Sequence, residues 1–295
     1  MLSAFLNTLP RGKYPGGEHI DVAIREYAQT RDGLKIRYEI RGQGDPLALI
    51  MGFSGSGRSW GEPFLQALER NFSLVVIDNR GTGESDKPDR PWTLADMAAD
   101  VVSVLDHAKI ARAHVYGISM GGMIAQELAL AYPGRVRGLV LGCTNCGASH
   151  SVQAAPEVLA NLMPLPGATP EEQARRAFSV ACGKAFLNSE RGKQVLDQAI
   201  ADMSKYPATP LHTFARQGAA IQGFDTRARL SEIKAPTLII HGDDDAIVPF
   251  QNARVLAQGI PGSRLHTIKD AGHMFFWEAP LEAAHVATEF LKTVR

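Results

Sequence analysis

The sequence predicts an α/β fold with a doubly wound, mostly parallel sheet and an inserted helical cap. Residues 47–51, 73–78 and 138–143 form short, almost continuously apolar runs, which are typical of strands buried on both faces. Segments with helical periodicity separate these runs, and this alternation favours a parallel sheet covered by helices on both sides. Between residues 148 and 223 the alternation stops, and apolar residues recur at helical spacing, interrupted by prolines. We therefore interpret this stretch as the helical cap.

The domain boundaries follow from these patterns. Residues 1–20 mix polar and apolar side chains with Pro and Gly, and we expect them to form an N-terminal extension on the surface. The α/β core is predicted to comprise residues 21–147 and 224–295. The cap is predicted to comprise residues 148–223, so it interrupts the core and does not follow it.

Local signals identify the remaining core elements. Residues 21–28 and 34–40 are predicted to be two strands of a hairpin, because an Asp-Gly pair at Asp32 lies between them. Thr93 is predicted to begin a helix, with Asp96 as its capping-box partner. The other predicted core elements are a helix over residues 58–70, strands at residues 237–241 and 264–268, and an amphipathic helix over residues 280–294.

Charge balance and hydropathy exclude several classes of partner. Lys plus Arg and Asp plus Glu each number 31, so nothing indicates binding to nucleic acid or to an anionic membrane. No apolar run approaches the roughly 20 residues that span a bilayer, and the N-terminus lacks the basic lead-in of a signal peptide. Three cysteines argue against a disulfide framework. We expect a cytoplasmic protein, and a homodimer is one candidate for its oligomeric state.

The most informative motif is Gly-x-Ser-x-Gly at residues 117–121, centred on Ser119. It follows a predicted strand and precedes a predicted helix, which is the context of a nucleophile elbow. The glycines suit a turn in which strand and helix crowd each other, and the helix N-terminus favours developing negative charge. The alternative interpretation is a glycine-rich turn whose serine only caps the helix.

A serine nucleophile needs a histidine base and usually a carboxylate that orients it. In an open α/β sheet such groups lie at the carboxyl ends of strands. Three adjacent aspartates at residues 243–245 follow one predicted strand, and His273 follows the next. His241 also lies at a strand end and competes with His273, although a structural role suits it better. The chain order is therefore Ser, Asp, His.

Taken together, these motifs resemble those of the α/β-hydrolases, and the resemblance extends from about residue 24 onward. The resemblance is carried by Gly-Ile-Ser-Met-Gly-Gly at residues 117–122, Asp-Asn-Arg-Gly-Thr-Gly-Glu-Ser at 78–85, His-Gly-Asp-Asp-Asp-Ala-Ile-Val-Pro at 241–249 and Asp-Ala-Gly-His at 270–273. The stretch from residue 117 to 141 is most similar to 3-oxoadipate enol-lactonases, cofactor-free haloperoxidases and small carboxylesterases. The segment at residues 78–80 resembles an element that braces a loop of this fold.

The resemblance implies a role for each matching residue. Ser119 is the nucleophile, His273 the general base, and Asp245 the acid, although three adjacent aspartates leave its register open. The backbone amides of Met120 and Phe53 match the family's oxyanion hole. Where the family usually has His-Gly, this chain has Met51-Gly52, so a polar group thought to brace the loop is missing.

Several side chains are weaker candidates for a substrate pocket. Ser54 and Trp60 follow the predicted oxyanion loop, although Trp60 suits helix packing equally well. Apolar residues at helical spacing are more often core than pocket, and the same alternative applies to the cap. The candidates in the cap are Met163, Phe178, Phe186 and Phe214, and those after the base are Met274 and Phe275.

These observations predict a serine hydrolase that cleaves a carboxylic ester or lactone with an apolar acyl or alcohol part through an acyl-enzyme intermediate. C–C bond hydrolysis and perhydrolysis stay open, since one triad supports all of them. The rival from another class is a small-molecule receptor on a hydrolase scaffold. Cys143 and Cys146 have C-x-x-C spacing, but small buried residues are the better interpretation. The histidines lack ligand-like spacing, so we predict no metal and no cofactor.

Overall fold

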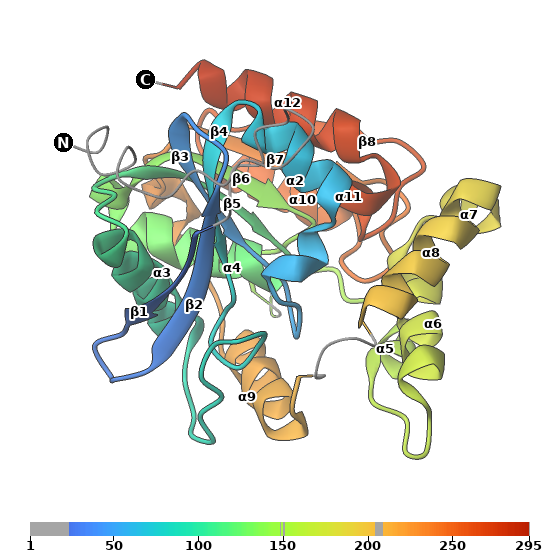
Figure 1. Ribbon diagram of the computed structural model, residues 1–295. Helices are drawn as coiled ribbons and strands as arrows, with labels where there is room; N and C mark the ends of the chain where they lie inside the picture. The colour runs from blue at the N-terminus through green and yellow to red at the C-terminus, as the bar shows by residue number, and fades with distance from the viewer. Residues whose placement is uncertain (1–23, 148, 150, 204–208, 295) are drawn as a thin grey trace, which may run out of the picture.

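The structure is a computed structural model that describes residues 24–147, 149, 151–203 and 209–294. The predicted extension at residues 1–20 lies outside the described residues. One eight-stranded sheet has the order β1-β2-β4-β3-β5-β6-β7-β8 and runs through the centre of the molecule (Figure 1). Its strands are β1 (Ile24–Gln29), β2 (Lys35–Arg41), β3 (Asp45–Ile50), β4 (Phe72–Ile77), β5 (Ala113–Ile118), β6 (Val136–Gly142), β7 (Thr237–Gly242) and β8 (Arg264–Ile268).

The sheet is mostly parallel, which confirms the predicted fold class. β1 and β2 form the expected antiparallel hairpin, and β2 is also antiparallel to β4. Every further pair from β4 to β8 is parallel. The carboxyl ends of β5, β6, β7 and β8 therefore meet along one edge of the sheet, which is where open α/β sheets bind ligands.

Helices cover both faces because neighbouring residues of the buried strands point to opposite sides. In β3, Leu49 belongs to one apolar cluster and Ile50 to the other. One face is covered by α3 (Leu94–His107), α4 (Met120–Ala131) and α10 (Gln251–Gly259). The other is covered by α2 (Glu62–Glu69), α11 (Phe275–Glu278) and α12 (Pro280–Lys292).

A capping box at α3 and a glycine before α2 explain where these two helices begin. Thr93 and Asp96 form the predicted capping box at the start of α3. The single helix expected over residues 58–70 is instead a short 3-10 turn, η1 (Gly57–Trp60), followed by α2. Gly61 separates them with a φ of 77°, a conformation that glycine adopts without steric cost.

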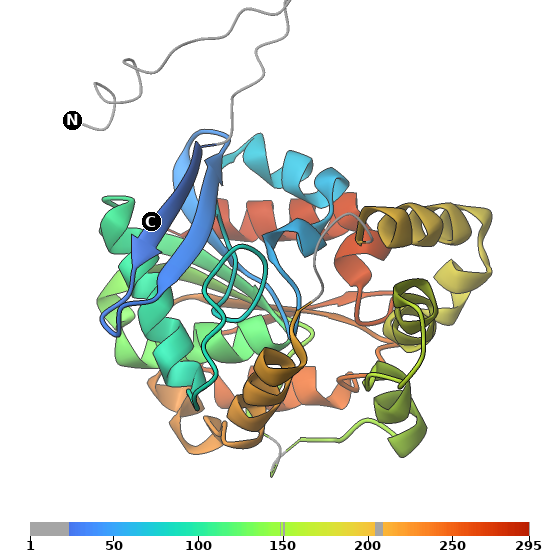
Figure 2. The ribbon, with the colours of Figure 1, turned by 60° about the horizontal axis from the view of Figure 1, so that its bottom comes forward.

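The inserted region between β6 and β7 is helical and has two separate parts. The helices α5 (Pro156–Leu162), α6 (Pro170–Ala181), α7 (Lys184–Asn188) and α8 (Glu190–Met203) form a lobe at one side of the sheet (Figures 1 and 2). The lobe has its own small apolar cluster around Phe178 and Ile200. The last helix, α9 (Leu211–Gln222), lies apart from the lobe, and its Ala220 joins a main core cluster. A 3-10 turn, η4 (Arg227–Glu232), then leads back to the sheet.

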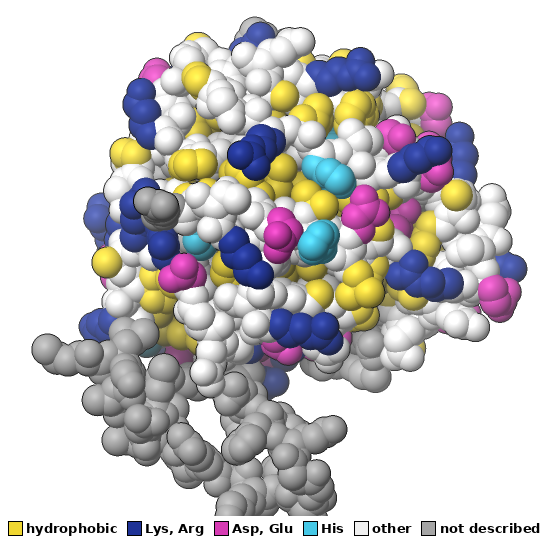
Figure 3. Space-filling model, turned by 90° about the horizontal axis from the view of Figure 1, so that it is seen from above, with side chains coloured by type: hydrophobic (Ala, Val, Ile, Leu, Met, Phe, Trp, Pro, Cys, Tyr) yellow, Lys and Arg dark blue, Asp and Glu magenta, His cyan; other side chains and the backbone are white. Residues whose placement is uncertain are grey.

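The face above the view of Figure 1, on which α12 lies, carries basic, acidic and hydrophobic side chains interspersed (Figure 3). The described part of that face shows no broad field of one charge, in keeping with a formal net charge of zero. Within the described ranges, none of the helices is long and apolar enough to cross a membrane.

Candidate active site

Ser119 lies in a sharp turn between β5 and α4. Its backbone has φ 53° and ψ −124°, a conformation that costs a non-glycine residue free energy and that persists only where the surroundings enforce it. A Cβ atom on Gly117 would lie 2.1 Å from the carbonyl oxygen of Gly121, and one on Gly121 would lie 2.0 Å from that of Ile50. The two glycines of the motif are therefore required by close backbone packing.

Neighbouring strands hold this strained turn in place. The Ser119 amide donates to the carbonyl oxygen of Gly142 at 2.8 Å, and the Thr144 hydroxyl donates to the carbonyl oxygen of Ser119 at 2.7 Å. On the opposite side, a Cβ atom on Gly52 would lie 3.0 Å from the Ser119 Cβ. The end of β6 and the loop after β3 thus enclose the serine from two sides.

His273 and Asp245 are in direct contact. Nδ1 of His273 lies 2.8 Å from Oδ2 of Asp245, and both residues are buried. The other carboxylate oxygen, Oδ1, accepts hydrogen bonds from the amides of Ile247 and Val248 at 2.9 and 2.8 Å. These amides fix the carboxylate in the turn after β7, so that it can hold the imidazole in one orientation.

The other two aspartates of the turn have different partners. Asp243 accepts a hydrogen bond from the amide of Asp270 at 2.6 Å, which ties the turn after β7 to the loop that carries His273. Asp244 accepts one from the amide of Lys184 at 2.9 Å, which ties the same turn to the cap. Each of the three carboxylates of this turn therefore holds a different segment.

His241, the competing histidine, contacts the carboxylate and not the serine loop. Its Nε2 lies 2.7 Å from the carbonyl oxygen of Val248 and 3.1 Å from Oδ2 of Asp245. The ring is fully buried at the end of β7. His241 thus helps to hold Asp245, a contact that the sequence spacing alone did not indicate.

The electrostatics of the pair favour an ionised carboxylate beside the imidazole. Burial alone would raise the pKa of Asp245, but the nearby His273 and His241 rings outweigh burial and hold that pKa below its usual range. Burial likewise opposes the imidazolium, yet the Asp245 carboxylate more than compensates and places the pKa of His273 well above its usual value. The His273 ring is therefore charged over a wider pH range than a free histidine.

Cys143, at the end of β6, lies beside the pair. Its Sγ, one ring nitrogen of His273 and one oxygen of Asp245 all lie within 4.8 Å of one another. Burial raises the pKa of the Cys143 thiol, although the neighbouring His273 ring opposes the change. These are ligand types that a thiophilic metal accepts, but both oxygens of Asp245 already have partners. A metal there would have to displace the bond to His273.

The two predicted oxyanion donors are placed by different elements. Met120 is the first residue of α4, where the amide has no acceptor within the helix. Phe53 lies in the loop after β3. Among the residues that the structure describes, neither amide donates to a protein acceptor. Both are therefore available to a developing oxyanion.

The segment at residues 78–80 holds the loop after β3 where the family's usual histidine is replaced. The Asn79 side chain donates to the carbonyl oxygen of Met51 at 2.8 Å. Asp78 accepts hydrogen bonds from the amides of Gly57 and Glu84 at 2.7 and 2.9 Å. The contacts match the loop-bracing element that the resemblance implies.

The pocket candidates are distributed over three environments. Trp60 and Phe275 are fully buried in the core, where the Trp60 ring stacks on Phe64 with centroids 5.4 Å apart. Helix packing was the alternative that the sequence left open for Trp60. Neither Trp60 nor Phe275 has a surface exposed to a pocket. Met163 is 45% exposed at the end of α5 and lies outside the apolar cluster of the lobe, contrary to the expectation of an inner face.

The other candidates contact either the lobe or the catalytic loops. Phe178 and Phe186 belong to the lobe's own cluster. Phe214 packs on Phe53 with ring centroids 4.4 Å apart, and Met274 contacts both the core and the lobe. Ser54 lies next to Phe53 and is half-buried. Phe214, Met274 and Ser54 thus stay candidates for the wall of the site.

Glu278 is a residue of the site's surroundings that the sequence did not reveal. Its carboxylate accepts hydrogen bonds from the amides of Gly272, at 3.0 Å, and of Gly183, at 2.9 Å. Gly272 precedes His273, and Gly183 precedes α7 of the cap. Burial raises the pKa of Glu278 to about 7, although the two amides oppose the change. An ionisable group thus joins the base loop to the cap.

Comparison with known proteins places these features in a family. The model of the alpha/beta hydrolase fold matches residues 45–280. The chain belongs to the α/β-hydrolase fold family. It is 32% identical over 254 residues to a putative carbamate hydrolase, RutD, of Azorhizobium caulinodans, covering 84% of this chain and 91% of the relative.

Solved structures agree with this assignment. The structure of Est816, described as an N-acyl homoserine lactone degrading enzyme, is 31% identical, has a TM-score of 0.76, and is matched over 90% of this chain and 100% of its own. The enol-lactonase from Burkholderia xenovorans LB400 is 26% identical, with a TM-score of 0.76 and the same two coverages. The relatives therefore include enzymes with different hydrolytic substrates, as the sequence motifs predicted.

Proposed function

We propose that the protein hydrolyses small carboxylic esters or lactones with an apolar acyl or alcohol part, through an acyl-enzyme on Ser119. The observation that carries the proposal is the strained backbone of Ser119 at a helix N-terminus, together with a buried His273–Asp245 pair on the loops after β7 and β8. Strain of this kind is retained at functional sites where it positions a reacting group.

The reaction follows from the roles of the individual groups. Nε2 of His273 accepts the Ser119 proton as Oγ attacks the carbonyl carbon, and the amides of Met120 and Phe53 stabilise the oxyanion. Collapse of the tetrahedral intermediate expels the alcohol, which takes the proton from the imidazolium. Water then attacks the acyl-enzyme with His273 again as base, which releases the acid and restores the serine.

The comparisons support ester or lactone cleavage more than they support a receptor. The similar structures include an enol-lactonase and an enzyme that degrades N-acyl homoserine lactones. The half-buried rings around the oxyanion loop are apolar, as the contact of Phe53 with Phe214 shows. An apolar wall favours a substrate with little charge.

The first test is turnover of p-nitrophenyl esters from acetate to laurate by the wild type and by Ser119→Ala. We expect a burst followed by steady turnover, and a fall of kcat on the order of 10⁶ in the variant, since the triad acts as a unit. N-acyl homoserine lactones of matched acyl length extend the series to lactones.

If the wild type is no faster than Ser119→Ala on every ester and lactone, the proposal is wrong. Turnover of a vinylogous 1,5-diketone, whose hydrolysis breaks a C–C bond, would then be measured to test C–C hydrolysis. Saturable binding of an ester without turnover would instead support the receptor interpretation.

A further inference from the structure

The oxyanion loop, defined here as residues 52–55, is a tight turn. The amide of Gly55 donates to the carbonyl oxygen of Gly52 at 3.3 Å, which closes a four-residue turn with Phe53 and Ser54 at its centre. Ser54 has a φ of 56°, and its position in the turn takes a positive φ in a type II turn but a negative φ in type I. Glycine normally fills it, so a serine there carries strain.

The cap helix α9 and Thr209, two residues before it, hold this turn through the two backbone groups of Ser54. Oε1 of Gln217 accepts a hydrogen bond from the Ser54 amide at 2.9 Å. The Thr209 hydroxyl donates to the Ser54 carbonyl oxygen at 2.8 Å. Type I and type II turns differ by a flip of the central peptide, whose N–H here is the Ser54 amide. An acceptor at that N–H therefore selects one of the two turns.

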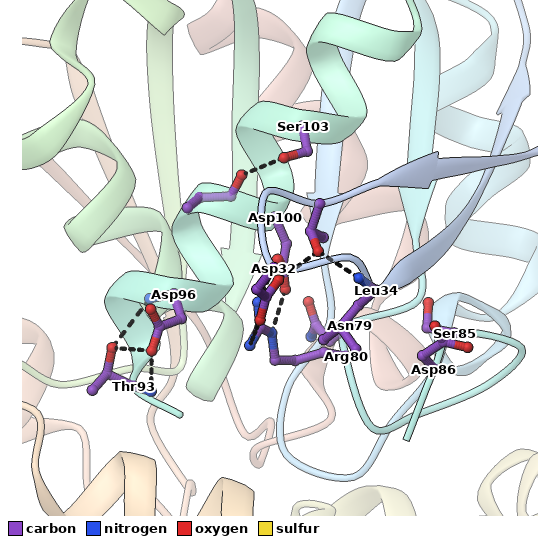
Figure 4. A network of polar contacts seen from close by, with 12 residues as sticks. Asp32, Leu34, Asn79, Arg80, Ser85, Asp86, Thr93, Asp96, Asp100 and Ser103 are labelled. Atoms are coloured by element: carbon purple, nitrogen blue, oxygen red, sulfur yellow. Dashed lines mark hydrogen bonds and ion pairs between the residues drawn. The ribbon is translucent and has the colours of Figure 1, made fainter. Parts of the chain in front are cut away.

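The Gln217 side chain is itself held by the backbone of Arg80. It is fully buried, and its Nε2 donates to the carbonyl oxygen of Arg80 at 3.1 Å. The Arg80 side chain makes two 2.6 Å contacts with Asp100 and lies 3.3 Å from Asp32 (Figure 4). The glutamine amide thus spans from a rigid ion-pair network to the oxyanion loop, and each of its two polar atoms has one partner.

We propose that Gln217 is a positioning residue that holds the oxyanion loop in its active conformation from the cap. Gln217 acts at Ser54, whereas Asn79 holds the start of the same loop at the carbonyl oxygen of Met51. By holding the Ser54 amide, Gln217 fixes ψ of Phe53 and φ of Ser54, and so the placement of the residue whose amide serves as oxyanion donor. The inference rests on the proposed ester hydrolysis.

The test compares Gln217→Leu with Thr213→Val in the full chain. Both residues are fully buried on one face of α9, one turn apart. The Thr213 hydroxyl donates to the carbonyl oxygens of Gly81 and Pro210, and within the described part of the chain none of its side-chain hydrogen bonds reaches residues 52–55. Thr213→Val therefore reports the effect of weaker α9 docking alone.

We expect Gln217→Leu to lower kcat for a p-nitrophenyl ester by about 10- to 100-fold with KM changed less than twofold, since a lost donor costs about 10²–10³ in kcat. Its affinity for a boronic acid, which mimics the tetrahedral intermediate, falls in proportion, and Thr213→Val changes both quantities less than threefold. Adding Ser54→Gly to Gln217→Leu restores part of kcat, because glycine adopts the positive φ without strain.

Hydrogen exchange followed by mass spectrometry tests the same point without turnover. Peptides that contain residues 52–55 exchange faster in Gln217→Leu than in wild type and Thr213→Val. Equal exchange and equal kinetics in the two variants would overturn the positioning role. Ser119-dependent turnover in the wild type would leave the proposed function standing in that case, so the two failures are distinguishable.

Discussion

The cap is attached to the catalytic loops at two places that differ in chemistry. On the base side, the segment before α7 meets the loop of His273, where Ala181 accepts a hydrogen bond from the Met274 amide and Gly183 donates to the Glu278 carboxylate. On the oxyanion side, Gln217 of α9 and Thr209, just before the helix, meet the loop of Phe53 through their neutral side chains. We call these the base anchor and the oxyanion anchor.

The difference teaches that the cap supports the two halves of the site by separate means. The base anchor includes a buried carboxyl with a pKa of about 7, so its strength depends on pH. The oxyanion anchor contains amides and hydroxyls, which do not titrate in that range. Proton uptake near neutrality should therefore affect the attachment of the base loop and leave the oxyanion loop in place.

The largest expected effect is the loss of kcat/KM when Asp245 is replaced, and it should distinguish this aspartate from its two neighbours. Asp245→Asn removes the charge that orients His273 and should lower kcat/KM by about 10⁴, as loss of the triad acid does elsewhere. Asp243→Asn and Asp244→Asn keep an acceptor for the amides of Asp270 and Lys184, so kcat/KM should change less than tenfold. Steady-state kinetics on one ester measure all three variants. A large loss at Asp243 or Asp244 instead would move the acid to that residue.

The pH profile of catalysis comes next. Because the base acts when neutral and the pKa of His273 lies well above its usual 6.5, kcat/KM should rise with pH, tenfold per unit below an apparent pKa above 6.5. Gln217→Leu should lower the whole profile without moving its midpoint. A profile that falls with rising pH, or a midpoint moved by Gln217→Leu, would contradict this assignment.

Glu278→Gln should change how stability depends on pH. The folded-state pKa of about 7 lies above the ordinary 4.5, so the folded chain binds more protons between these values and the free energy of unfolding falls as pH rises. Across that window the wild type should lose on the order of 3 kcal/mol relative to Glu278→Gln. Urea denaturation at several pH values measures the difference.

The matched control for Glu278→Gln is Gln217→Leu, which alters the oxyanion anchor. The stability difference between wild type and Gln217→Leu should stay constant over the same pH range. Parallel curves for wild type and Glu278→Gln would show that the carboxyl does not titrate there, and the distinction between the two anchors would fail.

The smallest effect is expected on the outside of the lobe. Met163 is 45% exposed and takes part in neither anchor. Met163→Ala should change the free energy of unfolding by less than about 0.5 kcal/mol and leave kcat/KM within twofold. Thermal unfolding and ester kinetics check both. A tenfold loss of activity would place Met163 in the pocket after all.

The sequence predicted the sheet and the elbow because both follow local rules. Buried strands need continuous apolar runs, and the crowded turn at Ser119 needs glycine at positions 117 and 121. The break of the helix at Gly61 was missed because a single glycine is also tolerated inside a helix. Local motifs thus suffice to mark the candidate reacting groups.

The anchors could not be predicted, because they join residues far apart in the chain. Gln217 meets Ser54 across 163 positions, and a buried glutamine has no signature that distinguishes it from a surface one. The role of Glu278 could not be predicted, because its neighbours in the sequence are apolar and belong to no motif. Met163 shows the reverse error, since an apolar side chain at helical spacing does not indicate which way it points.

The most direct test of the account is whether Ser119 carries the acyl group during turnover. The wild type would be mixed with p-nitrophenyl butyrate, quenched in acid within the burst phase, and analysed by intact-mass and peptide mass spectrometry. We predict one butyryl adduct per chain, located on the peptide that contains Ser119 and absent from Ser119→Ala. Turnover without any adduct, or an adduct on another residue such as Cys143, would contradict the mechanism.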